Sequence, residues 1–153
     1  MKQSIAYARV APDGIAALRG LEHYVRTSGL ESSLLELVKT RVSQMNGCAF
    51  CIDMHTKDAR AAGEQEQRLY ALPAWHDTPF YSQRERAALR WAEALTAMAQ
   101  HAIPPEAYVQ AREVFGEKEL VDLTLAIVAI NGWNRLAVPF GTPPGSYEPP
   151  ARR

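Results

Sequence analysis

Residues 31–63 read ESSLLELVKTRVSQMNGCAFCIDMHTKDARAAG, and their pattern predicts two helices joined by a tight turn. The apolar residues of the first part recur three and four positions apart, as on one face of a helix, and are Leu34, Leu35, Val38, Val42 and Met45. Asn46-Gly47 ends this helix, because both residues tolerate a positive φ. The second helix runs from about Cys48 to Ala62. This stretch therefore predicts a helical hairpin.

The segments on either side of the hairpin also show helical periodicity. We expect further helices over about 13–26, 64–72, 82–98, 105–115 and 118–138. Asp13 is expected to cap the first of these, and Ser82 with Glu85 has the spacing of a capping box. The aromatic-rich segment 73–80 is expected to be a loop. No alternation of period two indicates a strand, so the expected fold is all-α, with six or seven helices.

At 153 residues the chain has the length of a single domain. Residues 1–12 look like an extended arm, residues 13–138 contain the helices, and residues 139–153 form a Pro-rich tail. Proline fixes φ and lacks an amide donor, so the tail is expected to be an extended strap or a disordered end.

The composition is that of a globular protein, with 47% hydrophobic residues and 17 basic residues balancing 17 acidic ones. A net charge of zero gives no overall electrostatic reason to bind nucleic acid or an anionic membrane. No run of about 18 apolar residues is present, and the first residues are too mixed for a secretory signal. We therefore expect a cytoplasmic protein without nucleic-acid or membrane partners.

The two cysteines, Cys48 and Cys51, stand at the start of the second hairpin helix. Cys48 and Cys51 are three positions apart and Cys51 and His55 are four apart, so all three side chains share one helix face. The first turn of a helix stabilises a thiolate at Cys48, whereas the imidazole of His55 favours one at Cys51. Either effect makes a nucleophile available at neutral pH.

Glu36 joins this group through the geometry of the hairpin. It lies ten residues before Asn46, and His55 lies nine residues after Asn46. Glu36 is therefore expected to face His55 and to orient its ring, as a third group orients the base of a catalytic triad. Thr40 and Ser43 lie along the same side and are expected to hold a water molecule or to fill a close helix contact.

Other interpretations of this spacing stay open. A zinc site would use Cys48, Cys51 and His55, but no fourth ligand stands at a usual spacing. A c-type haem requires a histidine directly after the second cysteine, where this chain has Ile52. A thioredoxin-like motif would follow a strand, which this helical sequence does not predict. Two buried thiols can also lie near a histidine by coincidence. The spacing favours redox chemistry, with no metal site assigned.

A family resemblance adds to this interpretation. Glu36, eleven residues, Cys48-x-x-Cys51, three residues and His55 resemble, in type and spacing, the alkylhydroperoxidase D branch of the carboxymuconolactone decarboxylase superfamily. The resemblance covers most of residues 12–145 and includes the segments 72–75, 85–89, 92–96 and 130–136. It implies an all-helical peroxidase without a cofactor that works as a homo-oligomer, with a hexamer favoured over a trimer.

The resemblance also implies roles for the site residues. Cys51 is the cysteine that a peroxide oxidises to a sulfenic acid, Cys48 resolves it as a disulfide, and His55 and Glu36 relay protons. A dithiol protein, lipoyl-bearing in the best-known cases, regenerates the thiols. Founding members of the branch carry a second histidine between the cysteines, where this chain has Phe50. The alternative function is a dithiol-disulfide oxidoreductase or a redox sensor.

Two further groups of residues need an explanation. The first consists of aromatic residues expected in the core or at subunit contacts rather than at a substrate, namely Trp75, Phe80, Trp91 and Trp133. The second consists of polar residues on an apolar helix, namely Asn131, Asn134 and Arg135. If buried, these need partners, either in the site or across an interface.

Overall fold

The computed structural model describes residues 4–150, and every regular element within that range is helical, which confirms the all-α fold. The elements in chain order are α1 (Tyr7–Val10), α2 (Pro12–Arg26), α3 (Ser32–Met45), α4 (Ala49–Ala61), α5 (Glu66–Ala71), the 3₁₀ helix η1 (Leu72–Asp77), α6 (Gln83–Thr96), α7 (Pro105–Val114) and α8 (Glu117–Ala137). The capping box of Ser82 and Glu85 is present at the start of α6.

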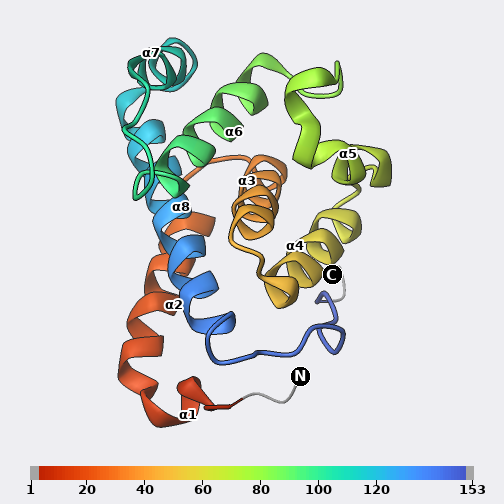
Figure 1. Cartoon of the computed structure of the whole chain (residues 1–153), viewed down its shortest axis with the longest axis vertical. Helices are drawn as coiled ribbons and strands as arrows, with labels where there is room; N and C mark the ends of the chain where they lie inside the picture. The colour runs from red at the N-terminus through yellow and green to blue at the C-terminus, as the bar shows by residue number, and fades with distance from the viewer. Residues whose placement is uncertain (1–3, 151–153) are drawn as a thin grey trace.

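Helix α3 lies at the centre of the molecule, with α2 and α8 on one side, α6 above and α4 on the other side (Figure 1). Its buried apolar side chains are Leu34, Leu35, Leu37, Val38 and Val42. Burying one such side chain contributes about 1.5–3 kcal/mol, so α3 is fixed in the core by most of its surface. Glu36 therefore projects from a rigid element.

The turn between α3 and α4 is held against α8 by hydrogen bonds. Gly47 adopts a φ of 66°, the left-handed conformation expected there. The Asn46 side-chain amide donates to Asn134 Oδ1 at 2.8 Å and to Asn131 Oδ1 at 3.0 Å. Asn134 in turn donates to Ser43 Oγ at 3.2 Å. The polar residues of α8 thus find their partners within the chain, and they fix the start of α4.

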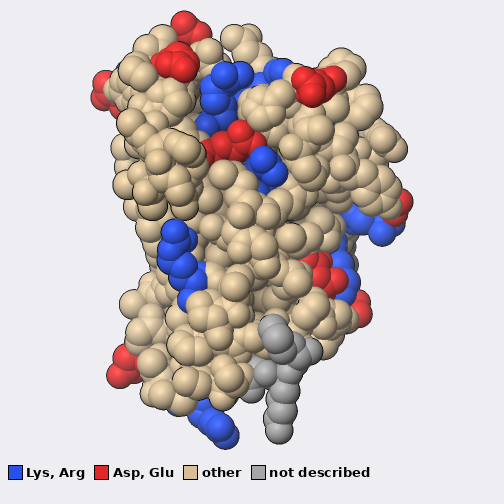
Figure 2. Space-filling view, in the orientation of Figure 1, with Lys and Arg blue, Asp and Glu red and all other residues tan. Residues whose placement is uncertain are grey.

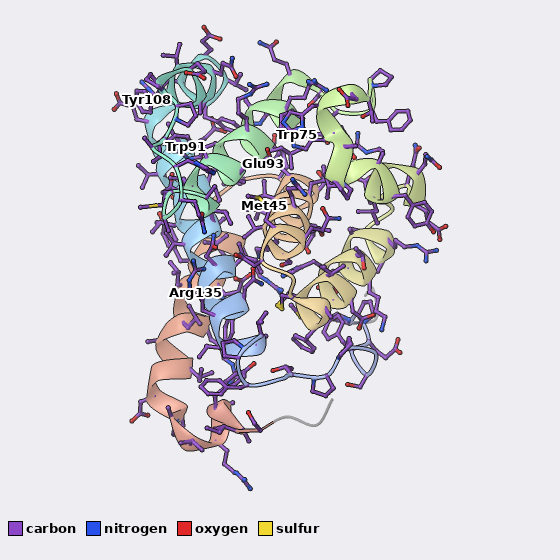
Figure 3. The ribbon with its side chains drawn as sticks, viewed as in Figure 1. Met45, Trp75, Trp91, Glu93, Tyr108 and Arg135 are labelled. Carbon is purple, nitrogen blue, oxygen red and sulfur yellow. A yellow bond between two sulfur atoms is a disulfide. The ribbon has the colours of Figure 1, made fainter. Side chains whose placement is uncertain are left out.

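Arg135 behaves differently from its two neighbours. Its side chain is exposed and donates to the backbone and side-chain oxygens of Asn131, at 3.0 and 2.8 Å (Figure 3). Arg135 therefore reinforces the end of α8 from the surface.

The N-terminal region differs from the sequence-based expectation. The expected extended arm contains the short helix α1, and α2 begins at Pro12 rather than being capped by Asp13. Proline suits the first position of a helix, because its φ is preset and its missing amide hydrogen is not needed there. The ring of Tyr7 lies 6.0 Å from that of Phe140, so α1 is anchored to the chain that follows α8.

The expected loop at 73–80 is replaced over most of its length by η1. Trp75 is fully buried there, and its Nε1 donates to Glu93 Oε1 at 2.8 Å (Figure 3). Trp91 is also buried and donates to Thr124 Oγ1 at 3.0 Å. These two tryptophans belong to the core as expected, whereas Phe80 is exposed.

The C-terminal tail, residues 139–150, runs from the end of α8 back to α4 of the same chain (Figure 1). Lys57 Nζ donates to the carbonyl oxygens of Gly145 and Tyr147, at 3.3 and 2.9 Å. Gly145 N donates to Asp53 Oδ2 at 2.9 Å. The tail is therefore an extended strap across α4. The last residues of the predicted tail, 151–153, and residues 1–3 of the predicted arm lie outside the described residues.

Charged side chains of both signs occur in small groups on the face shown in Figure 2, with broad uncharged areas between them. This distribution agrees with the balanced charge of the sequence. None of the helices within residues 4–150 combines the length and the apolar character needed to cross a bilayer.

Candidate functional site

The cysteine pair stands at the first turn of α4. Cys48 is the N-cap residue, and its Sγ accepts a hydrogen bond from the backbone amide of Cys51 at 3.3 Å. A disulfide joins the two residues, whose Cα atoms are 5.3 Å apart. Each side chain is only 1% exposed. The helix start thus presents both sulfurs on one face, with an orphan amide of the first turn directed at Cys48.

His55 and Glu36 meet across the hairpin. His55 Nδ1 lies 2.8 Å from Glu36 Oε2, and the imidazole is 3% exposed. Burial by itself would raise the pKa of Glu36, but the hydrogen bond to His55 and the positive charges of His55, Lys39 and Arg26 outweigh it and lower this pKa. An ionised carboxylate only accepts hydrogen bonds, so Nδ1 of His55 carries the proton. In the neutral ring Nε2 is then the proton acceptor.

A buried ion pair supports the negative charge of Glu36. Lys39 stands one turn after Glu36 on α3, is 1% exposed and donates to Glu22 of α2. Glu22 also lies 3.5 Å from the guanidinium of Arg26. A buried ammonium group requires such a partner, because an unpaired charge is costly to bury. Sequence reasoning missed Lys39, although its spacing of three from Glu36 places both on one helix face.

Asp58 is a further carboxylate at the site that sequence reasoning did not single out. Glu36, His55 and Asp58 offer ligand atoms that all lie within 4.8 Å of one another. Tyr147 of the tail donates its hydroxyl to Asp58 at 2.8 Å. Burial, together with this hydrogen bond and the charge of Asp58, raises the pKa of Tyr147 to about 12. Tyr147 therefore stays protonated at neutral pH and keeps Asp58 bonded to the tail.

Glu36, His55 and Asp58 are the one group within residues 4–150 whose side chains are close enough to hold a metal ion together, and this group differs from the Cys48–Cys51–His55 set that a zinc site would use. His55 Nδ1 and Glu36 already bond each other, and both sulfurs are bonded in the disulfide. The arrangement fits a proton relay beside a redox pair.

Cys51 and His55 line a cavity of about 510 Å³ between α1, α2, α4 and the end of α8. We call this the Cys51 cavity. Cys48 does not line it. The apolar part of its wall includes Tyr7, Ile15, Phe50, Met54 and Trp133. The tryptophans were expected in the core or at subunit contacts. Trp133 differs from this expectation, because it also lines the cavity. Phe50, between the two cysteines, adds apolar surface beside the sulfur.

Ser43 and Thr40 lie on the inner side of α3, and both are fully buried. Ser43 accepts a hydrogen bond from Asn134 and so fills the contact between α3 and α8. Thr40 Oγ1 makes no hydrogen bond to residues 4–150. Neither residue lines the Cys51 cavity.

Comparison with known proteins agrees with this fold. Residues 11–94 match the Carboxymuconolactone decarboxylase family. The Bacillus subtilis (strain 168) protein YdfG is 47% identical over 141 residues, which are 92% of this chain and 96% of YdfG. A crystal structure of ATU0492 from Agrobacterium tumefaciens, a protein of unknown function with a suggested role as the antioxidant defence protein AhpD, superposes with a TM-score of 0.91. It shares 42% identity and covers 95% of this chain and 100% of ATU0492.

A more distant structure shows the same fold. A peroxidase-related protein from Ralstonia eutropha JMP134 with an alkylhydroperoxidase AhpD core has a TM-score of 0.79 at 18% identity. The match covers 91% of this chain and 74% of the Ralstonia protein.

The fold and the site define an all-helical protein with a Cys-x-x-Cys disulfide at a helix start and a His–Glu pair beside it. The chain belongs to the carboxymuconolactone decarboxylase family, as an alkylhydroperoxidase D-like member.

Proposed function

We propose that this protein is a thiol-dependent peroxidase of antioxidant defence that reduces alkyl hydroperoxides or hydrogen peroxide through a Cys48–Cys51 dithiol/disulfide cycle. The observation that carries the proposal is the position of Cys51, which shares the Cys51 cavity with the His55 imidazole. Only a thiolate that a substrate can reach acts as a nucleophile. The helix dipole favours a thiolate at Cys48. Cys48 does not line the cavity, however, so we assign the attack on peroxide to Cys51.

The chemistry of one cycle follows from these positions. Neutral His55 takes the proton of the Cys51 thiol, and the thiolate attacks the peroxide oxygen, which breaks the O–O bond. The sulfur becomes a sulfenic acid, and the alkoxide takes a proton from the imidazolium to leave as an alcohol. Cys48 condenses with the sulfenic acid, which releases water and forms the disulfide. An external dithiol then reduces the disulfide by exchange and is itself oxidised. Glu36 stabilises the imidazolium that exists between the two proton transfers.

The proposed partners of the protein are a peroxide substrate and a dithiol reductant protein, which is lipoyl-bearing by family resemblance. The proposed compartment is the cytoplasm. The competing candidate is a dithiol-disulfide oxidoreductase or redox sensor, which would form the same disulfide without repeated consumption of peroxide. Both candidate functions are compatible with the fold and with the family. Repeated consumption of peroxide is therefore the property that distinguishes them.

Turnover with a hydroperoxide and a dithiol is the decisive test. We expect purified protein with cumene hydroperoxide and dihydrolipoamide to consume many equivalents of peroxide per chain. Mass spectrometry of the reduced protein after peroxide treatment should show a loss of two hydrogens, located at Cys48–Cys51 and reversed by dithiol. Stoichiometric oxidation without further consumption would support the sensor, and persistent free thiols or tightly bound zinc would contradict the redox cycle.

We also propose that the protein is a closed symmetric homo-oligomer, a hexamer ahead of a trimer. Exposed apolar side chains support this assembly, whereas Trp75 and Trp91 are buried within the chain itself. On α7 and α8 these are Tyr108, Val109, Val121 and Val128, each more than half exposed. Val121 and Val128 stand seven residues apart, so they lie on one face of α8. A contiguous exposed apolar face is typical of a subunit contact.

Light scattering on a sizing column tests the assembly. A mass of six times the 17.0 kDa chain, constant over micromolar concentrations, is the expected result. The double change Val121→Lys and Val128→Lys should lower the mass, whereas Val10→Lys, at a more exposed valine of α1, should not. A wild-type mass near that of one chain would contradict the proposal.

A further inference from the structure

The walls of the Cys51 cavity combine apolar side chains with an excess of positive charge. Arg9, Arg19 and Arg26 line it, and Glu22 is the single acidic residue of the lining. Glu22 is already shared between the buried ammonium of Lys39 and the guanidinium of Arg26. The lining therefore carries two more positive than negative charges.

Arg9 and Arg19 differ from the ion-paired arginines of the described residues. Neither takes part in an ion pair within residues 4–150, whereas arginines such as Arg41, Arg68 and Arg84 are paired with glutamates. Both are exposed and lie on neighbouring elements, Arg9 on α1 and Arg19 on α2. A guanidinium in this situation is free to bind a carboxylate through two parallel hydrogen bonds.

The cavity is larger and more apolar than a site for hydrogen peroxide needs to be. Pockets of about 300–1,000 Å³ hold organic ligands, and the Cys51 cavity measures about 510 Å³. Its aromatic side chains, Tyr7, Phe50 and Trp133, are suited to a hydrocarbon body. The reacting sulfur and the arginines lie on the same cavity, so one ligand can contact both.

We infer that the preferred substrates are organic hydroperoxides with an apolar body and a carboxylate, which Arg9 and Arg19 bind while the peroxide reaches Cys51. This inference rests on the proposed function and adds a substrate class to it. The two arginines bind and position the substrate, and they take no part in breaking the O–O bond.

A matched pair of substrates tests the inference. Cumene hydroperoxide and its 4-carboxy derivative differ in the carboxylate alone. We expect a higher kcat/KM for the carboxylated compound, through a lower KM at similar kcat. The Arg9→Gln/Arg19→Gln double variant should lose about tenfold in kcat/KM for this compound and stay within about twofold for the uncharged one. Arg112→Gln, at an arginine of α7 outside the cavity, should change neither value.

Two further measurements separate this inference from the proposed function. In titration calorimetry, 4-isopropylbenzoate should bind the oxidised protein more tightly than 4-isopropylbenzamide. This preference should vanish in the double variant and weaken in 0.5 M NaCl, because salt screens exposed charges. If no hydroperoxide is turned over but the benzoate preference depends on both arginines, the proposed function fails and the anion site stands. Equal kcat/KM for both hydroperoxides with equal binding of benzoate and benzamide would overturn the inference and leave the function intact.

Discussion

Replacing Cys51 by serine is expected to abolish hydroperoxide consumption, with a loss of about a thousandfold or more, because the covalent route through the sulfur disappears. Serine fills the same place at the first turn of α4, so the fold and the Cys51 cavity should be retained. The measurement is peroxide consumption by the reduced variant in the presence of dithiol, with circular dichroism to verify its helical content.

Cys48→Ser is the matched control, because it removes the neighbouring sulfur of the same disulfide. This variant should react once with peroxide and stop at a sulfenic acid on Cys51, since the resolving thiol is missing. A dimedone-type reagent followed by peptide mapping should place the label on Cys51. If Cys51→Ser instead consumes peroxide at the wild-type rate and dimedone labels Cys48, the roles of the two sulfurs are reversed.

The second large effect is expected at the proton relay. His55→Ala should lower kcat/KM by about a hundredfold or more, the range typical for loss of a general base. Glu36→Ala should have a smaller effect of about tenfold to a hundredfold, because Glu36 acts through His55. In both variants the acidic limb of the pH–rate profile should move to higher pH, since each loses a group that favours the Cys51 thiolate.

Conservative variants separate this role from a structural one. Glu36→Gln keeps the shape and a hydrogen-bond acceptor but removes the charge, so its pH profile should also move upward. Glu31→Gln is the matched control on the same stretch of chain. Glu31 is paired with Arg84, whose hydrogen bond lowers the Glu31 pKa, but Glu31 lies outside the Cys51 cavity. An unchanged acidic limb in Glu36→Gln, or the same shift in Glu31→Gln, would contradict the relay.

The lowered pKa of Glu36 determines how the stability that this carboxylate contributes changes with pH. Its pKa lies below the ordinary value of 4.5 in the folded protein. The carboxylate is therefore charged at neutral pH, and the stability that it contributes is fully present above its ordinary pKa. That contribution is lost as the pH falls through the lowered value.

The local features of this protein could be predicted from its sequence because they depend on residues close together in the chain. The spacing of apolar residues predicted α3, and Asn46-Gly47 predicted the turn after it. Glu36 and His55 stand at nearly equal distances in sequence from this turn. The sequence therefore predicted that they face each other, because two antiparallel helices advance equally per residue. The helical spacing likewise placed Cys48, Cys51 and His55 on one face.

Local signals were less informative where packing competes with them. Nothing in residues 1–12 marks a helix strongly, and α1 forms where Tyr7 packs near Phe140, more than a hundred residues later in the chain. The 73–80 segment has the aromatic residues and prolines of a loop. It becomes η1 because Trp75 is buried and bonded to Glu93.

The contacts that give the site its chemistry were decided by the tertiary structure. Lys39 meets Glu22, Asp58 meets Tyr147, and Arg9 reaches the cavity that holds Cys51. The partners of each contact lie on different elements, and helical periodicity specifies a face without specifying what packs against it. The same reason explains the two cysteines. The sequence by itself determined that both lie on one helix face, and only the packing of α1, α2 and α8 around α4 determined that the cavity opens onto Cys51.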